Sequence, residues 1–551
     1  MKLRDYQDYA TSAIFEYFGN QNGNPLVVMP TGTGKSLVIA DFCKRALIKY
    51  RGTRIMLLTH VKELIEQDFD KLIKVWPTAP AGIYSSGLKR KDTFYPITFG
   101  GVASVVKVKD FNIFGKIDLL LIDEGHLVSP KDESSYGKII TALRLINPYL
   151  KVVGFTATDF RLGHGRLTEE KHIFTDVCVD MSKRESFNWF IEQGYLVPLI
   201  PRKPNLEVDV SNIKMRGGEY IDAEAQAAVD KQEITYAACK EMIELGANRR
   251  KWLIFSSGIE HAQHISQMLD ALDINNTFVH SKMAESERDK RIADFKTGKY
   301  QAIVNNGILT TGFDDTEIDM IGMLRLTQSP GLWVQMLGRG TRPCYTSGYD
   351  LNTKQGRLDS ILHSQKQNCL VLDFAGNTKR LGPVNDPVIP RPKSKIKGEA
   401  PIKICDACMC YNHTSARFCF NCGEEFPKHL NIKQQSSTEE LIAANSEQPV
   451  TTVFNVDKIT YQHHFKEGKP GSMKVTYYSG LRRFTEYICF EHLGYPAKKA
   501  QDWWRVARGS PNEKAPLTTS EAMRELDVLR KPKRIKVWIN KDNPEILDYE
   551  Y

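Results

Sequence analysis

A lysine and a serine end a glycine-rich turn near the start of the chain, in the run Pro30-Thr31-Gly32-Thr33-Gly34-Lys35-Ser36. Glycines let successive backbone N–H groups face an anion, and the start of a following helix adds its dipole. In such a loop Lys35 reaches the β- and γ-phosphates of a nucleotide, and Ser36 can ligate Mg²⁺. The run therefore predicts a phosphate-binding loop, although Met29 stands where the strict pattern has its first glycine.

Two adjacent carboxylates, Asp123 and Glu124, follow the apolar run 119–122. Open parallel sheets bind ligands at the C-terminal ends of their strands, which is where this pair would lie. Asp123 is expected to hold Mg²⁺, directly or through water, and Glu124 to orient and deprotonate the water that attacks the γ-phosphate. The alternative is an acidic entry to a loop, which the phosphate site at Lys35 disfavours.

A cluster of cysteines predicts a metal site. Two C-x-x-C turns, which begin at Cys405 and Cys419, are separated by ten residues. Four thiolates so placed are typical of a closed tetrahedral zinc site with a structural role. Cys410 and His413 are alternative ligands, and Cys410 is interpreted as a spare thiol because the first turn is already complete without it. The predicted zinc ligands are Cys405, Cys408, Cys419 and Cys422.

These residues need a scaffold, and the chain of 551 residues is long enough for several domains. Short apolar runs alternate with helix-like segments up to about residue 185 and again from about residue 252, which predicts two α/β units with buried parallel strands. Basic, proline-rich and polar stretches read as linkers. The predicted divisions are 1–187 and 188–375 for the α/β domains, 376–404 for a basic linker, 405–428 for the zinc module, 429–450 for a polar linker and 451–551 for a C-terminal domain.

Composition and charge narrow the class of protein. The chain has 41% hydrophobic and 26% charged residues, which excludes a mostly disordered, a collagenous or a small disulfide-stapled protein. No stretch approaches the roughly 18 apolar residues of a membrane span, and the charged start does not resemble a signal peptide. We therefore expect a cytoplasmic protein without membrane contact. The net charge of +9, which lies mainly after residue 375, indicates a polyanionic partner.

The C-terminal segment combines aromatic and basic residues. Alternation of apolar and polar residues over 472–478 and 534–539 predicts strands of a small β-rich (α+β) domain. Aromatic side chains among cations suit the stacking of nucleic-acid bases. The alternative, which stays open, is that Trp503, Trp504 and Trp538 are core residues of an ordinary domain.

Together these stretches resemble the motifs of superfamily 2 helicases. Asp123-Glu124-Gly125-His126 is similar to motif II of the DEAH type, with glycine as its third residue. Ala103 stands where the family often has glutamine, and Asp159 where it has proline. The other matching segments are 3–7 (glutamine motif), 30–36 (motif I), 59–64 (motif Ia), 100–104 (a strand-contacting loop), 156–158 (motif III), 253–257 (motif IV), 309–314 (motif V) and 335–342 (motif VI).

The resemblance implies the fold and the nucleotide site. It implies two tandem RecA-like P-loop domains of the α/β class with ATP between them, followed by the four-cysteine zinc module and the C-terminal domain. Gln7 would read the adenine. Arg339 and Arg342, three residues apart on one face of a helix, would stabilise transition-state charge, with pairing to surface carboxylates as the alternative. The implied catalytic residues are Lys35, Asp123, Glu124, Gln335, Arg339 and Arg342. Nucleotide contacts are expected at Arg4, Gln7, Thr31, Gly32, Thr33, Gly34, Lys35, Ser36, Asp123, Gly312 and Asp314, and Mg²⁺ at Ser36 and Asp123.

The same resemblance implies how a strand would be held and how hydrolysis would be coupled to it. Nucleic-acid contacts through backbone amides and hydroxyls, which carry little sequence information, are expected at Thr59, Lys62, Ser104, Ser256 and Thr310. Coupling between ATP and the strand is expected at His126, Thr156 and Thr158.

The helicase core, zinc module and tail most resemble the bacterial RadD helicase family, on the strings 60–64, 87–91, 160–163 and 372–377. This implies an ATP-dependent DNA helicase or translocase in replication, recombination or repair, in the nucleoid of a bacterial or phage-infected cell. Its expected partners are single-stranded or branched DNA, bound without sequence preference, and single-stranded-DNA-binding or recombination proteins. The alternatives are an RNA helicase, a motor subunit of a restriction or defence complex, and a scaffold with an inactive ATPase.

Overall fold

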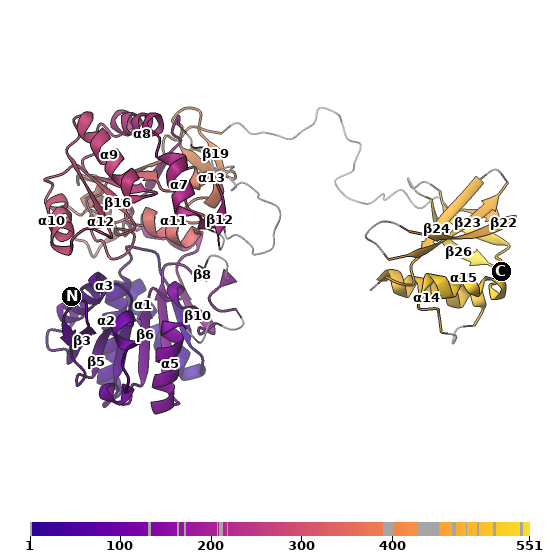
Figure 1. Ribbon diagram of the computed structural model, residues 1–551, viewed down its shortest axis with the longest axis horizontal. Helices are drawn as coiled ribbons and strands as arrows, with labels where there is room; N and C mark the ends of the chain where they lie inside the picture. Colours follow the sequence, from indigo (N-terminus) through magenta and orange to yellow (C-terminus); the bar gives the residue numbers. More distant parts are fainter. Residues whose placement is uncertain are drawn as a thin grey trace. The chain divides into compact units, whose positions relative to one another are not determined.

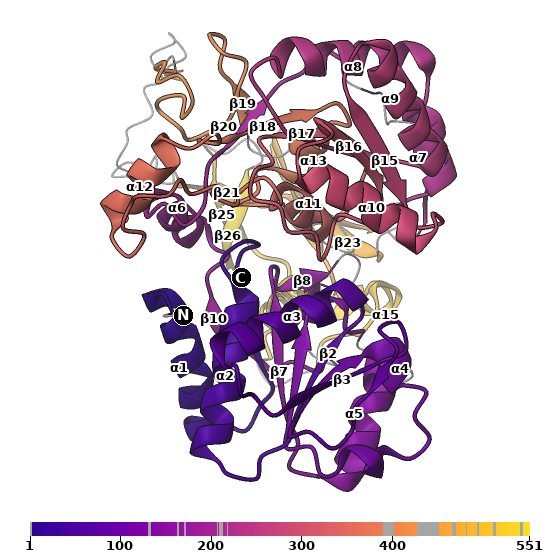
Figure 2. The ribbon, with the colours of Figure 1, turned by 90° about the vertical axis from the view of Figure 1, so that its left-hand side faces the viewer.

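The computed structural model describes residues 3–129, 134–161, 165–169, 172–206, 208, 213–216, 219–388, 402–426, 451–465, 470–480, 482–492, 495–510, 514–539 and 544–551. The chain divides into two compact units, Met1–Lys428 and His429–Tyr551. The predicted polar linker, 429–450, and most of the predicted basic linker, 389–401 of 376–404, lie outside the described residues. In the first unit, two sheets form two separate lobes (Figures 1 and 2).

Lobe 1 is built on an eight-stranded sheet whose strands pair in parallel, except for the antiparallel pair β3 and β4. Both faces of the sheet are covered, so successive residues enter different core clusters: Val27 and Leu57 face one side, Leu26 and Met56 the other. Strands buried on both faces require the continuous apolar runs seen in the sequence. In sheet order the strands are β10 (Asp176–Asp180), β1 (Pro25–Val28), β7 (Lys151–Thr156), β6 (Leu119–Asp123), β2 (Ile55–Thr59), β5 (Ile97–Gly101), β3 (Ala81–Ser85) and β4 (Arg90–Lys91).

Helices cover the two faces of this sheet. On one face lie α1 (Asp5–Asn20), α2 (Lys35–Lys49), α3 (Lys62–Val75) and α6 (Arg184–Glu192), and on the other lie α4 (Val102–Val105) and α5 (Ser135–Ile146). Phe187, Phe190 and Leu196 are buried in the lobe 1 cluster that holds Tyr6. The core of lobe 1 therefore extends beyond the predicted boundary at residue 187, because α6 packs its apolar face against α1.

Lobe 2 contains a six-stranded, fully parallel sheet. Its strands, in sheet order, are β11 (Leu199–Arg202), β18 (Cys369–Asp373), β17 (Met320–Leu324), β14 (Trp252–Ser256), β16 (Ala302–Asn306) and β15 (Asn276–His280). One face packs against α8 (Gln232–Leu245) and α9 (Ile259–Ala271), and the other against α10 (Glu285–Lys296), α11 (Pro330–Leu337) and α13 (Asn377–Leu381). The remaining helices are α7 (Asp222–Val229) and α12 (Lys354–Leu362). The two lobes confirm the predicted pair of RecA-like domains.

Three short hairpins complete the first unit. The pairs β8 (Phe160–Arg161) with β9 (Gly165–Arg166) and β12 (Met215–Arg216) with β13 (Glu219–Tyr220) are antiparallel. The cysteine module contains β19 (Ile402–Ile404) and β20 (Tyr411–His413), and it packs on the edge strand of the lobe 2 sheet. There Arg202 and Cys410 form an antiparallel bridge, and the Lys203 N–H donates to the Met409 carbonyl at 2.8 Å. The module therefore covers backbone groups that an edge strand would otherwise expose.

The second unit contains two three-stranded antiparallel sheets, ordered β21-β25-β26 and β22-β23-β24. Its elements are β21 (Thr451–Asn455), β22 (Lys458–His464), β23 (Ser472–Ser479), β24 (Arg482–Ile488), α14 (Tyr495–Arg508), α15 (Thr519–Arg524), β25 (Arg534–Trp538) and β26 (Glu545–Glu550). Both predicted strands, β23 and β25, are present. Trp503 and Trp504 are 6% and 1% exposed in the core, so these two tryptophans cannot stack on bases, whereas Trp538 is half-buried.

No helix within the described ranges is long and apolar enough to cross a membrane.

Candidate active site

The phosphate-binding loop lies between β1 and α2. Gly32 and Gly34 have φ values of 88° and 87°, in the left-handed region where a side chain would be strained. Lys35 begins α2, and its Nζ lies 3.3 Å from Glu124 Oε1, which directly follows β6. Although burial opposes the charge, Glu124 and Asp123 raise the pKa of Lys35 and keep it an ammonium ion. The structure thus brings the predicted lysine to the predicted carboxylates.

The N-terminal glutamine contacts the same loop. Gln7 Nε2 donates to the Thr33 carbonyl at 3.0 Å, and Gln7 Oε1 accepts from the Arg4 N–H at 3.1 Å. The Arg4 guanidinium lies over the ring of Tyr195, 4.6 Å from its centre. Both predicted nucleotide contacts at this end of the chain therefore lie beside the phosphate-binding loop, and the reading of adenine by Gln7 stays a prediction.

The two carboxylates of motif II have different environments. Asp123 and Glu124 are only 4% and 8% exposed. Burial raises the pKa of Asp123 to about 6, with Lys35 opposing the shift. Despite its burial, Lys35 and His126 lower the pKa of Glu124, so this side chain is a carboxylate at neutral pH. Glu124 also has a left-handed backbone with φ 54°, an uncommon conformation for a residue with a β-carbon and one that clusters at functional sites.

The residues at this site fit a divalent cation. Asp123 Oδ1 is buried and has no hydrogen-bond partner among the described residues. A buried carboxylate oxygen without a partner is costly, and it is also the ligand that Mg²⁺ prefers. Ser36 stands next to Lys35 at the start of α2. Asp123 and Ser36 are therefore the residues that would hold Mg²⁺, and this role stays a prediction.

A third acidic residue, Asp68, belongs to the same site and was not predicted. Asp68 lies on α3, is 1% exposed, and neither of its oxygens has a hydrogen-bond partner in the described part of the chain. Burial and the Asp123 carboxylate raise the pKa of Asp68 well above its usual range, and nearby Ser36 and Lys35 oppose this. One sequence signal could have revealed it. The buried residues of α3 are Leu64, Ile65, Asp68 and Leu72, which places an acid on the apolar face of an amphipathic helix.

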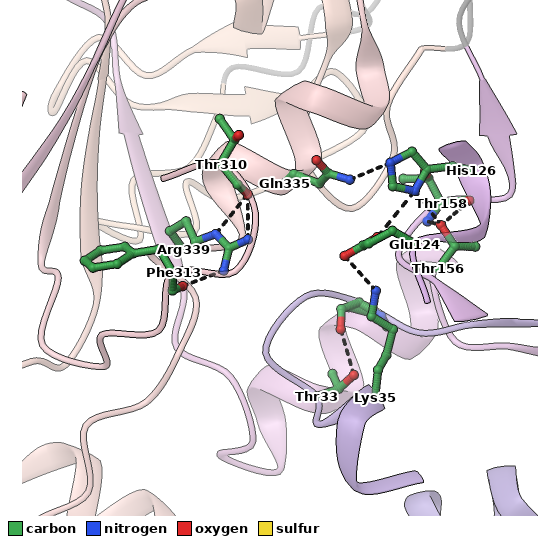
Figure 3. A network of polar contacts seen from close by, with 11 residues as sticks. Thr33, Lys35, Glu124, His126, Thr156, Thr158, Thr310, Phe313, Gln335 and Arg339 are labelled. Atoms are coloured by element: carbon green, nitrogen blue, oxygen red, sulfur yellow. Dashed lines mark hydrogen bonds and ion pairs between the residues drawn. The ribbon is translucent and has the colours of Figure 1, made fainter. Parts of the chain in front are cut away.

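A polar path leads from Glu124 to lobe 2 through His126 (Figure 3). His126 Nδ1 lies 3.3 Å from Glu124 Oε2 and 3.0 Å from Thr156 Oγ1, and His126 Nε2 lies 2.9 Å from Gln335 Nε2 on α11. Thr156 Oγ1 accepts in turn from the Thr158 N–H at 3.2 Å. The three predicted coupling residues are thus in one network, which extends to Gln335 of motif VI.

The two arginines of motif VI differ from the expected arrangement. The expectation that they share one face of a helix is wrong, because α11 ends at Leu337 and both arginines follow it in a non-helical segment. Arg339 donates to the Thr310 carbonyl at 2.5 and 3.1 Å and to the Phe313 carbonyl at 2.6 Å, all within its own lobe. Arg342 lies 2.9 Å from Asp314 Oδ1 and also donates to Phe313. Burial and neighbouring Arg342 lower the pKa of Arg339 to about 9. Both charged ends are therefore engaged by motif V in this conformation, and their action on a γ-phosphate stays a prediction.

Motif VI nevertheless lies against the phosphate-binding loop. A β-carbon added at Gly338 would come within 2.5 Å of the Thr31 β-carbon, and one added at Gly32 would come within 3.2 Å of Arg342 Cγ. Close approach of side chains from the other motif thus explains a glycine in each motif. Gly312 of motif V also crosses the interface, because its carbonyl accepts a hydrogen bond from Gln67 of lobe 1.

The five predicted nucleic-acid contacts differ in how far their side chains are buried. Thr59 and Ser256 are 1% and 0% exposed, and their hydroxyls donate to backbone carbonyls of their own lobes. Thr310 is also buried, and its carbonyl accepts from Arg339. Lys62 and Ser104 are partly exposed, and Lys62 forms an ion pair with Glu285 of lobe 2. Only the latter two present side chains at the surface here, so a strand could reach the others only through backbone groups or after rearrangement.

The cysteine module has the geometry of a zinc site. The Sγ atoms of the four predicted ligands all lie within 4.8 Å of one another, and two pairs, Cys405–Cys422 and Cys408–Cys419, are each 3.6 Å apart. A tetrahedral site with Zn–S bonds of about 2.3 Å needs sulfur separations of about 3.8 Å. Among the described residues Cys410 and His413 stand outside this cluster; Cys410 packs in the core of the module. The donor set therefore fits zinc.

The two C-x-x-C turns have the same backbone form. Met409 and Gly423, which follow the turns, have left-handed φ values of 58° and 77°. The Met409 N–H donates to the Cys405 carbonyl at 2.7 Å, and the Gly423 N–H donates to the Cys419 carbonyl at 2.9 Å. A repeated turn that orients two thiols each time is the arrangement that a closed four-thiolate site requires.

Two protein-family models match this chain. Residues 1–161 match the family model described as "Type III restriction enzyme, res subunit", and residues 235–344 match the model described as "Helicase conserved C-terminal domain". The two matches fall on the two lobes that the His126–Gln335 contact joins. The chain carries the core of a superfamily 2 helicase. The chain spans 60% and 53% of the lengths of two fungal relatives, which are named as ATP-dependent helicases.

Similar proteins include one from a fungus, one from a phage and a solved structure from a bacterium. The chain is 27% identical over 400 residues to the Schizosaccharomyces pombe protein named as mitochondrial ATP-dependent helicase irc3, covering 71% of this chain and 60% of that protein. It is 24% identical over 430 residues to a 51.5 kDa protein of a Lactococcus phage, covering 75% of this chain and 81% of that one. A solved fragment of an HsdR subunit of a type I restriction enzyme from Vibrio vulnificus aligns with a TM-score of 0.48 and 16% identity, covering 68% of this chain and 65% of that one.

Proposed function

We propose that this chain is an ATP-dependent DNA helicase or translocase that couples ATP hydrolysis to movement along DNA or to its remodelling. The observation that carries the proposal is the continuous polar path from Lys35 through Glu124 and His126 to Gln335. A phosphate-binding lysine and a general base are thereby linked to the second lobe, which is what a motor with two alternating lobe positions requires.

The chemistry assigned to the first lobe follows from its charges. Glu124, kept ionised by Lys35 and His126, can orient a water molecule and accept its proton. Lys35 would exchange its ion pair with Glu124 for the β- and γ-phosphates of ATP, which frees the carboxylate to act. Asp123 and Ser36 would hold Mg²⁺, which neutralises phosphate charge when it is bound.

The second lobe would respond to this exchange. Arg339 and Arg342 are held by carbonyls and by Asp314 of motif V, and the Arg342 side chain lies close to Gly32 of the phosphate-binding loop. We propose that they turn from motif V to the γ-phosphate when nucleotide binds, and return after hydrolysis. Their movement would shift motif V, and Thr310 with it, so that the grip of lobe 2 on a strand changes in each cycle.

The substrate and pathway belong to the same proposal. The RadD-like order of helicase core, cysteine module and basic tail supports a role in replication, recombination or repair, on single-stranded or branched DNA and without sequence preference. Single-stranded-DNA-binding or recombination proteins are the proposed protein partners, and the nucleoid of a bacterial or phage-infected cell the proposed location. The phage relative supports this setting.

Movement can be measured directly. On a biotinylated single strand capped with streptavidin, we expect ATP to accelerate streptavidin release, and Glu124→Gln to abolish the acceleration. RNA of the same length, which the RNA-helicase alternative would favour, is expected to support less release. ATP-dependent release from RNA alone would contradict the choice of DNA, and no release from either strand would contradict translocation.

A motor subunit of a restriction or defence complex is the second candidate. One observation favours it, namely the match of residues 1–161 to the model named for a restriction enzyme subunit. Such a motor needs a nuclease partner. Purification of the chain from its own cells decides between the two: a nuclease recovered in stoichiometric amount would favour the second candidate.

A further inference from the structure

The second compact unit has the strand order of an OB-fold. Only Val456 and Asp457 separate β21 from β22, so these two strands form one bent strand that joins both sheets, pairing with β25 at one end and β23 at the other. The chain then runs β23, β24, α14, β25 and β26. Because β24 and β26 lie side by side, the five resulting strands close into a small barrel, with a helix between the third and the fourth. This is the topology of the OB-fold, whose second and third strands bind oligonucleotides on their outer face.

The strand pairing separates the inner face of the barrel from its outer face. Met473, Val475 and Tyr477 of β23 lie in the core together with Trp504 of α14 and Ala522 of α15, so both helices pack on the inner side of these strands. Figure 1 shows α14 and α15 on one side of β22–β24. Paired residues of antiparallel strands point to the same side. The outer face of β22–β24 is therefore made of Lys458, Thr460, Gln462, His464, Ser472, Lys474, Thr476, Tyr478, Arg483, Thr485 and Tyr487.

This outer face is basic and, among the described residues of its three strands, has no carboxylate. Lys458, Lys474 and Arg483 supply positive charge, and no ion pair joins any of them to an acid within the described part of the second unit. Two acids adjoin residues of this face in the sequence, Asp457 and Glu486, and both accept hydrogen bonds from groups outside the face. Asp457 Oδ2 accepts from the Gly480 N–H at 2.7 Å, and Glu486 points to the core, where it accepts from Tyr477, Trp503 and Tyr549.

Aromatic rings are interleaved with these cations. Tyr487 is 50% exposed and lies beside His464, with 4.9 Å between ring centres. Tyr478 lies between Lys458 and Arg483 in the register of the three strands. Exposed rings flanked by cations are the features that bind single-stranded nucleic acid without sequence preference, because every base has a face that stacks and every nucleotide a phosphate. A merely solvated sheet face would be expected to mix acids with its cations.

We propose that the outer face of β22–β24 is a second binding site, for single-stranded DNA, in which Tyr478 and Tyr487 stack on bases while Lys458, Lys474 and Arg483 contact phosphates. The inference rests on the proposed function only in the choice of DNA as the polymer. Trp503 and Trp504 lie in the core, as the alternative left open by the sequence has it, and the proposed stacking residues are tyrosines on the opposite side of β23 and β24. Part of the positive charge of the tail, from Lys458, Lys474 and Arg483, lies on this face.

Photo-crosslinking of the full chain identifies the site independently of the motor. A single-stranded 20-mer that carries 5-iododeoxyuridine is irradiated with the chain in the absence of nucleotide, and the cross-linked peptides are mapped by mass spectrometry. We expect cross-links at Tyr478 or Tyr487. Cross-links confined to residues 1–428 would overturn the proposal, whatever the ATPase activity of the chain. Cross-links at the tyrosines without ATPase stimulation would instead leave this face in place and overturn the proposed motor function.

Binding of a fluorescent 20-mer, followed by anisotropy, measures the contribution of each group. Tyr487→Ala should weaken binding about 5- to 150-fold, the effect of losing one stacked base, whereas Tyr487→Phe should leave it nearly unchanged. Replacing Lys474 and Arg483 by alanine should lower the slope of log affinity against log salt by about 1.4, which corresponds to two phosphate contacts on a single strand. Lys536→Ala, which removes an exposed cation from β25 in the other sheet, is the matched control and should change neither quantity. Equal affinities for all variants, or tighter binding of duplex DNA or RNA than of single-stranded DNA, would refute the proposal.

Discussion

The contact between Gln335 and His126 joins motif VI of lobe 2 to the DEAH box of lobe 1 in the present conformation. Its two nitrogens lie 2.9 Å apart, and His126 also lies beside Glu124 and Thr156. Replacing Gln335 by alanine removes this hydrogen bond and leaves the His126 contacts in lobe 1 intact. A hydrogen bond of this kind contributes about 0.5–1.5 kcal/mol, which corresponds to about 2- to 12-fold in a rate. We therefore expect DNA-stimulated ATP turnover to fall by that factor in Gln335→Ala.

A double-mutant cycle shows whether the effect passes through His126. In steady-state ATPase assays with saturating single-stranded DNA, His126→Ala should lower turnover by itself, since it removes contacts to Glu124 and Thr156 as well. In that background Gln335→Ala should have no further effect. Gln367→Ala is the control, because Gln367 of lobe 2 also makes one side-chain hydrogen bond, to the Leu362 carbonyl at 2.8 Å, at the surface. An undiminished effect of Gln335→Ala in the absence of His126 would refute the coupling path.

Three further predictions concern the carboxylates and the cysteines. Glu124→Gln should keep ATP binding but lower turnover at least roughly 10²-fold, as single-turnover assays would show; turnover near the wild-type value would exclude Glu124 as the base. Asp68→Asn should weaken Mg²⁺-dependent ATP binding and raise the free energy of unfolding by about 1–3 kcal/mol at neutral pH, because an unpaired buried carboxylate is removed. Since the folded-state pKa of Asp68 is raised, the wild-type chain should lose stability relative to this variant as pH rises above the ordinary aspartate range; denaturant melts at two pH values that show a constant difference would contradict this. Elemental analysis should find about one zinc per chain, and Cys419→Ser should lose it whereas Cys410→Ser should retain it; equal zinc in both variants would rule out the assigned ligand set.

Local patterns in the sequence predicted the scaffold and its two chemical centres. The apolar runs 119–122 and 252–255 became β6 and β14 because a parallel strand covered on both faces must be apolar throughout. Lys35 and Asp123 could be placed together because the strands that lead to them, β1 and β6, are parallel strands of one sheet and end at the same edge. The four clustered thiols could be predicted because they lie on two local turns.

Long-range placement could not be predicted in the same way. Asp68 joins the site only because α3 packs on α2, which brings its carboxylate near Ser36 and Asp123. Arg339 contacts motif V only because the segment after α11 lies against Thr310 and Phe313. The tail illustrates the same limit. The aromatic and basic composition of 451–551 was visible, but only the packing of α14 puts Trp503 and Trp504 in the core, and only the register of β22–β24 puts the tyrosines on the outer face.

The central claim, a nucleic-acid-dependent motor, is tested most directly by the ATPase activity of the purified full chain. Turnover should be measured without nucleic acid and with single-stranded, forked, gapped and four-way DNA and RNA, with Lys35→Ala as the inactive control. We expect DNA to stimulate turnover in the wild-type chain and the variant to stay inactive throughout. Turnover that no nucleic acid increases would contradict it.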